Sequence, residues 1–290
     1  MRVYNSTELG PYPDRLIERL QYWAAAAPDR VLLASRDGEG WRKITYLVAM
    51  NAARAIGQAL LDRGLSLKRP VLILSGNGIE HGLLALACLN VGIPFVPVST
   101  AYSLASTDFA RLRDIAALVR PGLVFADDGD HYAAALLACT PKDAEVVITR
   151  GDADRRATFF DALVATTPTD TVESAANAIN PDTVAKLLFT SGTTGAPKGV
   201  INTNRMMCSL MQMVRGCHPM LVEEAPVLVD WLPWNHILGG TVSFCIALYN
   251  GGTIYIDDGK PYRVKSRRRF ATCEKSRRSS TRMSRRVTRN

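Results

Sequence analysis

The spacing of apolar residues changes period repeatedly along the first half of the chain. Leu16, Ile17, Leu20 and Trp23 recur at near-helical spacing and predict an amphipathic helix over 13–27. Further helices are expected over 47–64, 79–91, 108–121 and 130–139, and strands over 31–46 (a pair around an Asp-Gly turn), 69–78, 93–99, 122–128 and 145–149. Strands that alternate with helices in this way are typical of parallel βαβ units. The fold class is therefore predicted to be α/β, with doubly wound, mainly parallel sheets.

The second half of the chain is less regular. Residues 150–182 are polar and poor in periodicity, and we interpret them as a connecting segment. Strands are expected over 185–191 and at the start of 227–240, where two glycines then begin a helix. The stretch 248–261 is typical of a helix end, a Gly-Gly turn and a short strand.

Composition narrows the class of protein. With 290 residues, of which 47% are hydrophobic and 21% charged, the chain is long enough to bury a sizeable core. The longest apolar run, 82–98, is broken by Asn90 and two prolines, so we expect a buried helix and strand rather than a membrane span. The six cysteines form no CxxC pair, and no leading apolar stretch follows a basic start. These features favour a cytoplasmic protein with reduced cysteines and no metal site.

The segment LLFTSGTTGAPKGV, residues 187–200, carries the strongest chemical indication. Glycines let successive backbone N–H groups converge on an anion, hydroxyls add donors, and a lysine adds a full charge. The residues expected to bind phosphate are Thr190, Ser191, Gly192, Thr193, Thr194, Gly195 and Lys198. A Walker A loop is disfavoured, because Pro197 precedes the lysine where that motif requires glycine. The competing interpretation is a plain hairpin turn, which leaves the lysine and the hydroxyls unexplained.

This segment resembles the phosphate-binding signature of the AMP-forming acyl-activating enzymes, the superfamily of acyl-CoA synthetases, luciferases and peptide-synthetase adenylation domains. The stretch VLVDWLPWNHILGG, residues 227–240, follows at about the interval the family shows. The resemblance implies that His236 flanks the carboxylate of the acid, and that Gly239 and Gly240 leave room for the acyl chain or nucleotide. Taken alone, His236 is better explained as a strand-end histidine bonded to backbone, and only the neighbouring motif residues reverse that preference. The sequences of residues 86–104, 227–240 and 248–261 most resemble those of feruloyl-CoA synthetases.

The resemblance implies a two-step ligase. A carboxylic acid, here a hydroxycinnamate such as ferulate, attacks the α-phosphate of ATP with Mg2+ and releases pyrophosphate. Coenzyme A then displaces AMP from the acyl-adenylate to give a thioester. The expected partners are therefore small molecules, namely the acid, ATP and CoA. Many relatives carry a histidine where this sequence has Asn204.

Parts of the family pattern have no counterpart in this sequence. Relatives are longer, with a Tyr-Gly-x-Thr-Glu segment and a small C-terminal domain that supplies a catalytic lysine. We find no residue for that lysine, so the catalytic residue stays unassigned. Residues 1–261 are expected to be the first part of the N-terminal AMP-binding domain, a truncated and impaired form of the enzyme. Uncovered apolar surface would then favour self-association.

Residues 262–290 differ sharply in charge from the rest. They hold ten arginines and two lysines against one glutamate, a net of +11, which leaves −3 of the overall +8 for residues 1–261. Three interpretations are open: a tail that binds nucleic acid or anionic membrane, a solvated disordered terminus, or an out-of-frame translation product, which we favour. We expect no specific nucleic-acid partner. The alternatives to the ligase are a non-catalytic nucleotide- or nucleic-acid-binding fragment and an adenylating ligase for another acid.

Overall fold

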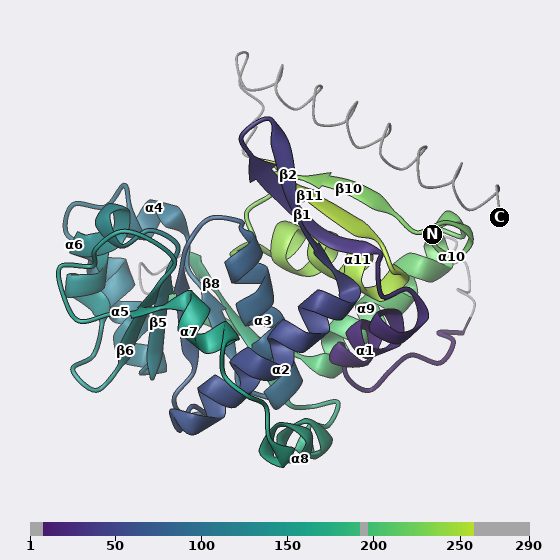
Figure 1. The fold of residues 1–290 in the computed structure, drawn as a ribbon, viewed down its shortest axis with the longest axis horizontal. Helices are drawn as coiled ribbons and strands as arrows, with labels where there is room; N and C mark the ends of the chain where they lie inside the picture. The colour runs from purple at the N-terminus through teal and green to yellow at the C-terminus, as the bar shows by residue number, and fades with distance from the viewer. Residues whose placement is uncertain (1–7, 192–196, 258–290) are drawn as a thin grey trace, which may run out of the picture.

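The computed structural model describes residues 8–191 and 197–257, which fold into two β-sheets with helices between and around them (Figure 1). The strand order of the larger sheet is β7-β6-β5-β3-β4-β8-β9 and that of the smaller sheet is β10-β11-β1-β2. The predicted α/β class with mainly parallel, doubly wound sheets is therefore confirmed. The expected tail at 262–290 lies outside the described residues.

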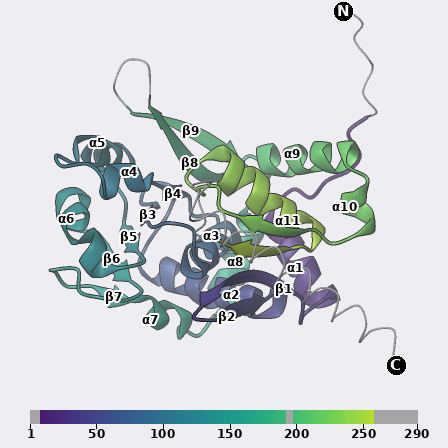
Figure 2. The same ribbon diagram turned by 90° about the horizontal axis from the view of Figure 1, so that it is seen from above.

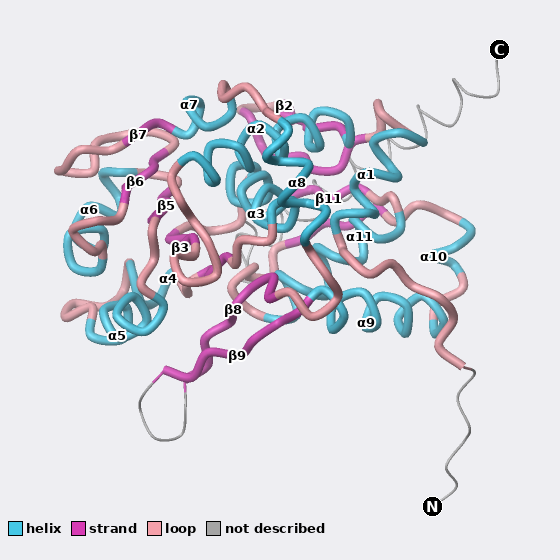
Figure 3. The backbone as a smooth tube through the Cα atoms, turned by 90° about the horizontal axis from the view of Figure 1, so that it is seen from below, coloured by secondary structure: helices cyan, strands magenta, loops and turns pink. Residues whose placement is uncertain are grey.

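The larger sheet is parallel except at one edge. Its strands are β3 (Val71–Leu74), β4 (Phe95–Pro97), β5 (Leu123–Ala126), β6 (Glu145–Ile148), β7 (Thr158–Phe159), β8 (Val184–Ser191) and β9 (Pro197–Thr203). Only β9 runs antiparallel to its neighbour, β8. Together β8 and β9 form a hairpin that projects from the body of the molecule (Figure 3).

The smaller sheet joins the two ends of the described chain. It contains β1 (Val31–Asp37), β2 (Gly40–Thr45), β10 (Val227–Asp230) and β11 (Thr253–Ile256). β1 pairs with β11 in parallel, although more than two hundred residues separate them in sequence. The β1–β2 hairpin turns at Gly38, whose φ of 53° is the left-handed conformation that the predicted Asp-Gly turn requires.

The helices cover both sheets and fill the space between them. They are α1 (Ile17–Ala26), α2 (Tyr46–Asp62), α3 (Ile79–Val91), α4 (Thr100–Ser103), α5 (Ala110–Val119), α6 (Gly129–Cys139), α7 (Phe160–Val164), α8 (Asp170–Ala178), α9 (Asn204–Cys217), α10 (Met220–Glu223), the π-helix η1 (Leu238–Ser243) and α11 (Phe244–Asn250). Helix α3 is buried on all sides between the two sheets (Figure 2), as its nearly continuous apolar sequence dictates. No helix of the described residues is long and apolar enough to cross a bilayer.

One expectation from the sequence is wrong. Residues 150–182 are not a plain connection, because they form β7, α7 and α8. The elements are too short to display a full period, and only Phe160, Leu163, Val172 and Ala176 are buried. Helix α8 is nevertheless capped, since the Thr169 hydroxyl accepts the Thr171 amide hydrogen. Short amphipathic elements with two buried positions each escape a search for periodicity.

Candidate nucleotide and acyl site

The described residues of the predicted phosphate-binding segment, 187–191 and 197–200, lie in the β8–β9 hairpin. Thr190 pairs directly with Lys198, and Ser191 pairs with Pro197. The backbone of the described segment is thus a hairpin. Its described end, which we call the hairpin tip, lies at the carboxyl edge of the parallel sheet, because β8 runs parallel to β4. Phosphate binding by this segment stays a prediction. Ligands of such sheets bind beyond that edge.

The described residues of this tip expose their chemistry. Thr190 and Lys198 are both exposed, and the ion pairs of the described residues do not include Lys198. Directly opposed residues of an antiparallel pair project from the same face, so this hydroxyl and this ammonium are neighbours. The other predicted phosphate-binding residues of the loop, Gly192, Thr193, Thr194 and Gly195, lie outside the described residues.

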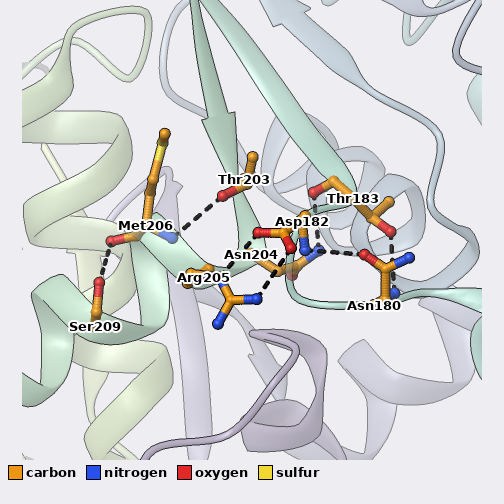
Figure 4. A network of polar contacts seen from close by, with 8 residues as sticks. All are labelled: Asn180, Asp182, Thr183, Thr203, Asn204, Arg205, Met206 and Ser209. Atoms are coloured by element: carbon orange, nitrogen blue, oxygen red, sulfur yellow. Dashed lines mark hydrogen bonds and ion pairs between the residues drawn. The ribbon is translucent and has the colours of Figure 1, made fainter.

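The base of the hairpin is fixed by a polar network (Figure 4). Arg205 donates two hydrogen bonds to the Asp182 carboxylate, at 2.8 and 3.0 Å, and joins the start of α9 to the start of β8. Asn204 is buried, accepts the Leu16 amide hydrogen at 3.1 Å and donates to the Thr183 carbonyl. Asn204 therefore anchors the hairpin, in a position where its side chain cannot reach a ligand at the tip.

The predicted acyl-side residues lie together after β10. The His236 amide donates to the Pro233 carbonyl at 3.0 Å, and the Gly240 amide donates to the His236 carbonyl at 2.8 Å. His236 is exposed, whereas Gly239 and Gly240 lie inside the π-helix η1 rather than before it. A Cβ on Gly240 would overlap the Trp234 carbonyl, so only glycine fits this close approach. We call residues 231–240 the acyl-side turn.

Two side chains outside the predicted set hold the acyl-side turn. Asn77, in the loop after β3, donates to the Leu232 carbonyl at 2.8 Å and accepts the Trp234 amide hydrogen at 3.0 Å. Asp230, at the end of β10, accepts the Trp234 indole hydrogen at 2.9 Å, and burial raises the pKa of its carboxyl. Asn77 follows a strand of the larger sheet and Asp230 ends a strand of the smaller one, so the turn is held from both sides.

The turn is also tied to the phosphate hairpin. Lys186 of β8 is buried, and its ammonium donates to the Gly240 carbonyl at 2.6 Å. This hydrogen bond connects the strand that leads into the predicted phosphate loop to the glycine pair of the acyl-side turn. The structure thereby brings the two predicted halves of the site into one connected unit.

A cavity of about 700 Å3 lies beside the acyl-side turn, at the carboxyl ends of strands from both sheets. Asn77, Trp231 and Asn235 line it, together with Asp127 and Asp257. The Asp127 Oδ1 atom and both carboxylate oxygens of Asp257 are buried, and no described residue forms a hydrogen bond with them. These oxygens can therefore accept hydrogen bonds from a ligand. A second cavity, of about 520 Å3, lies beside Lys68 and Arg120 at the opposite edge, and none of the described site residues lines it.

A family model described as "AMP-binding enzyme" matches residues 20–281, most of the chain. The chain belongs to the AMP-binding enzyme family. Membership confirms the resemblance at the level of the superfamily, and it leaves the similarity to feruloyl-CoA synthetases as a prediction.

Curated relatives of this AMP-binding chain include CoA ligases of several acids. A "Long-chain-fatty-acid--CoA ligase FadD15" of Mycobacterium tuberculosis is 28% identical over 74% of this chain and 36% of its own length. A "Sulfoacetate--CoA ligase" of Cupriavidus necator is 28% identical over 83% of this chain and 44% of its own length. The chain thus spans less than half the length of these relatives.

Solved structures confirm the fold. A putative long-chain-fatty-acid CoA ligase from Rhodopseudomonas palustris aligns with a TM-score of 0.68 at 22% identity, over 84% of this chain and 57% of that one. A fatty acyl-adenylate ligase from L. pneumophila, in complex with acyl adenylate and pyrophosphate, aligns with a TM-score of 0.63 at 20% identity, over 83% and 39%.

Sequence analysis of this family member missed Asn77, Asp230 and Lys186. Asn77 looks like an ordinary turn residue in SGNG, and Asp230 looks like a strand end. Lys186 was detectable in principle, because a lysine in the middle of an apolar strand has to be either exposed at an edge or buried for a reason.

Proposed function

We propose that this chain carries the phosphate-binding and acyl-binding parts of an AMP-forming acid–thiol ligase. In the proposed reaction, the carboxylate of the acid attacks the α-phosphate of MgATP and releases pyrophosphate. The thiol of coenzyme A then takes the acyl group from the adenylate and releases AMP. The observation that carries the proposal is the pairing of Thr190 with Lys198 at the carboxyl edge of the sheet, in a chain of the AMP-binding family.

On the phosphate side, the proposed role of the hairpin tip is to bind the β- and γ-phosphates. The exposed ammonium of Lys198 and hydroxyl of Thr190 supply a charge and a donor from one face. Charge on the departing pyrophosphate grows during the first step, so a fixed cation stabilises the transition state more than the bound substrate. We assign the same role to Ser191, Gly192, Thr193, Thr194 and Gly195 from the resemblance alone.

On the acyl side, the proposed role of the turn is to orient the carboxylate. His236 is exposed at the start of η1, and Gly239 and Gly240 keep the backbone free of side chains beside it. Positioning of this kind accounts for much of the rate enhancement of a displacement in which the protein forms no covalent bond. The cavity beside the turn offers about 700 Å3 for a substrate group.

The acid that we propose is a hydroxycinnamate such as ferulate. Support comes from the sequences of residues 86–104, 227–240 and 248–261, which most resemble those of feruloyl-CoA synthetases. The names of the relatives include a fatty acid and sulfoacetate, so an adenylating ligase for another acid is the competing proposal.

Equilibrium binding to this chain tests the proposal. We expect calorimetry with a non-hydrolysable ATP analogue and Mg2+ present to detect ferulate binding, and weaker binding of sulfoacetate and a long-chain fatty acid. Tighter binding of sulfoacetate or of the fatty acid would contradict ferulate as the proposed substrate and favour that acid instead. Absence of binding for all acids and for the analogue would contradict the ligase proposal itself.

A further inference from the structure

Lys186 is an unusual residue for its position. Its side chain is only 1% exposed, in a strand flanked by β4 and β9. The ammonium donates to the Gly240 carbonyl at 2.6 Å and lies 6.0 Å from the centre of the Phe95 ring. Among the residues that the structure describes, no carboxylate forms an ion pair with it. A buried cation without an acidic partner is rare in proteins.

Such a burial costs stability. Desolvation lowers the pKa of Lys186 to about 8. The ionisable groups that face it are the Cys245 thiol on α11 and the His81 imidazole on α3, and neither is a counter-ion: burial raises the pKa of Cys245 to about 11 and lowers that of His81 to about 4. An apolar side chain of similar length would fill this volume at lower cost. The ammonium is therefore needed for its hydrogen bond rather than for packing.

The acceptor of that hydrogen bond is a sensitive point of the site. Gly240 lies in a π-helix, a geometry that is often found at functional sites, and it is wedged against the Trp234 carbonyl. Its amide donates to the carbonyl of His236. A displacement of Gly240 would therefore move His236 and the rest of the acyl-side turn.

We propose that Lys186 is a positioning residue that sets the distance between the acyl-side turn and the phosphate hairpin. This inference rests on the proposed function, because the distance matters only if the acid and the phosphates bind at these two places. Lys186 and Thr190 belong to the same strand, four residues and about 13 Å apart. The hydrogen bond to Gly240 therefore fixes the acyl-side turn, which is proposed to hold the acid, relative to the strand that is proposed to hold the phosphates. In-line attack on a phosphate is sensitive to errors of about 1 Å, which makes a rigid reference valuable.

The test compares two buried hydrogen bonds to backbone carbonyls. Lys186→Met keeps the length of the side chain and removes the donor. Tyr46→Phe is the matched control, because the Tyr46 hydroxyl donates to the Ala247 and Gly252 carbonyls, at 3.2 and 2.9 Å, in the same C-terminal region but outside the turn. Ferulate and ATP-analogue affinities are measured for each variant of the full chain, with Lys186→Gln as a second variant that keeps a shorter donor.

We expect Lys186→Met to weaken ferulate binding by at least about tenfold and ATP-analogue binding by less than about threefold, with Lys186→Gln in between. Tyr46→Phe should change neither affinity. Equal losses for both ligands, or a Lys186→Met variant that matches Tyr46→Phe, would overturn the positioning role.

Hydrogen exchange separates this inference from the proposed function. We expect backbone amides of η1 to exchange faster in Lys186→Met than in Tyr46→Phe, whether or not the chain binds an acid. Wild-type chain that binds neither ligand would refute the proposed function, and the exchange data would still report on Lys186. Unchanged exchange at η1 in Lys186→Met would overturn the inference.

Discussion

Thr190 and Lys198 face each other across the β8–β9 hairpin as a directly paired couple. The pairing places a hydroxyl and an ammonium on one face at the carboxyl edge of the larger sheet. A hairpin can hold two donors at a fixed spacing more rigidly than an unpaired loop, because both strands are hydrogen-bonded along their length. The same rigidity is reinforced at the base of the hairpin by the Arg205–Asp182 pair.

Replacement of Gly240 by alanine is predicted to disrupt the acyl-side turn. The added methyl group would overlap the Trp234 carbonyl, a backbone atom that cannot rotate away. We expect a loss of about 1–3 kcal/mol in the free energy of unfolding, typical of overpacking, measured by urea denaturation. Gly216→Ala is the control, because a Cβ there meets nothing within 4 Å. Equal stability of the two variants would show that the turn adapts freely.

Removal of the Asn77 amide is predicted to release the same turn from the larger sheet. Asn77→Ala loses both the hydrogen bond to the Leu232 carbonyl and the one from the Trp234 amide. We expect stability to fall by about 1–3 kcal/mol and ferulate affinity to fall more than ATP affinity. Asn77→Asp keeps the acceptor for Trp234 and should be intermediate. An Asn77→Ala variant with unchanged ferulate affinity would remove this residue from the site.

Stability is predicted to depend on pH through His81. The imidazole is buried against Trp234, and burial lowers its pKa to about 4 from an ordinary value of 6.5. The unfolded chain binds a proton near pH 6.5, whereas the folded chain resists protonation until about pH 4. This contribution to stability is therefore complete above about pH 6.5 and is lost as the pH falls through 4, by up to about 3 kcal/mol.

Chemical denaturation at several pH values measures this dependence. We expect a shallower loss between pH 6.5 and 4 in His81→Gln, because glutamine does not titrate. Parallel pH profiles for His81→Gln and wild type would mean that carboxylates alone control the acid sensitivity.

Self-association is predicted from exposed apolar side chains near the smaller sheet. Large apolar side chains are exposed on α9, α10 and β10, namely Met206, Met213, Met220, Val222 and Val227. β10 is also an edge strand of the described sheet. Exposed apolar patches beside a free strand edge favour association. Sedimentation velocity should detect oligomers that Met213→Lys with Met220→Lys reduces, and a monodisperse wild-type monomer would contradict this prediction.

Most of the helices and strands could be predicted from local sequence. The strand ahead of the phosphate loop, the helix at 79–91 and the Gly-Gly turn before β11 are confirmed, because each has a long apolar run or a glycine at the required turn. The left-handed φ of 66° at Gly64 and 70° at Gly251 matches the expected helix ends. Such features depend on neighbours in sequence.

Features that depend on distant neighbours could not be predicted. The roles of Asn77 and Lys186 arise only when residues 155 and 54 positions away, respectively, come within hydrogen-bonding distance. Nothing in the sequence indicated that Gly239 and Gly240 lie inside a π-helix, where they approach the backbone of Leu232 and Trp234. Candidate site chemistry was visible in the sequence, whereas the contacts that orient it were not.

Binding of MgATP to this chain tests the central claim most directly. The affinity for MgATP is measured by titration at one ionic strength for wild type, Lys198→Met and the control Lys142→Met. Lys142 is an exposed lysine that is far from the hairpin in sequence. We predict saturable binding by wild type and by Lys142→Met, and a loss of at least about tenfold in Lys198→Met, as for a charge-assisted hydrogen bond to phosphate. Equal MgATP affinity in all three proteins would contradict the assignment of the hairpin tip as the phosphate site.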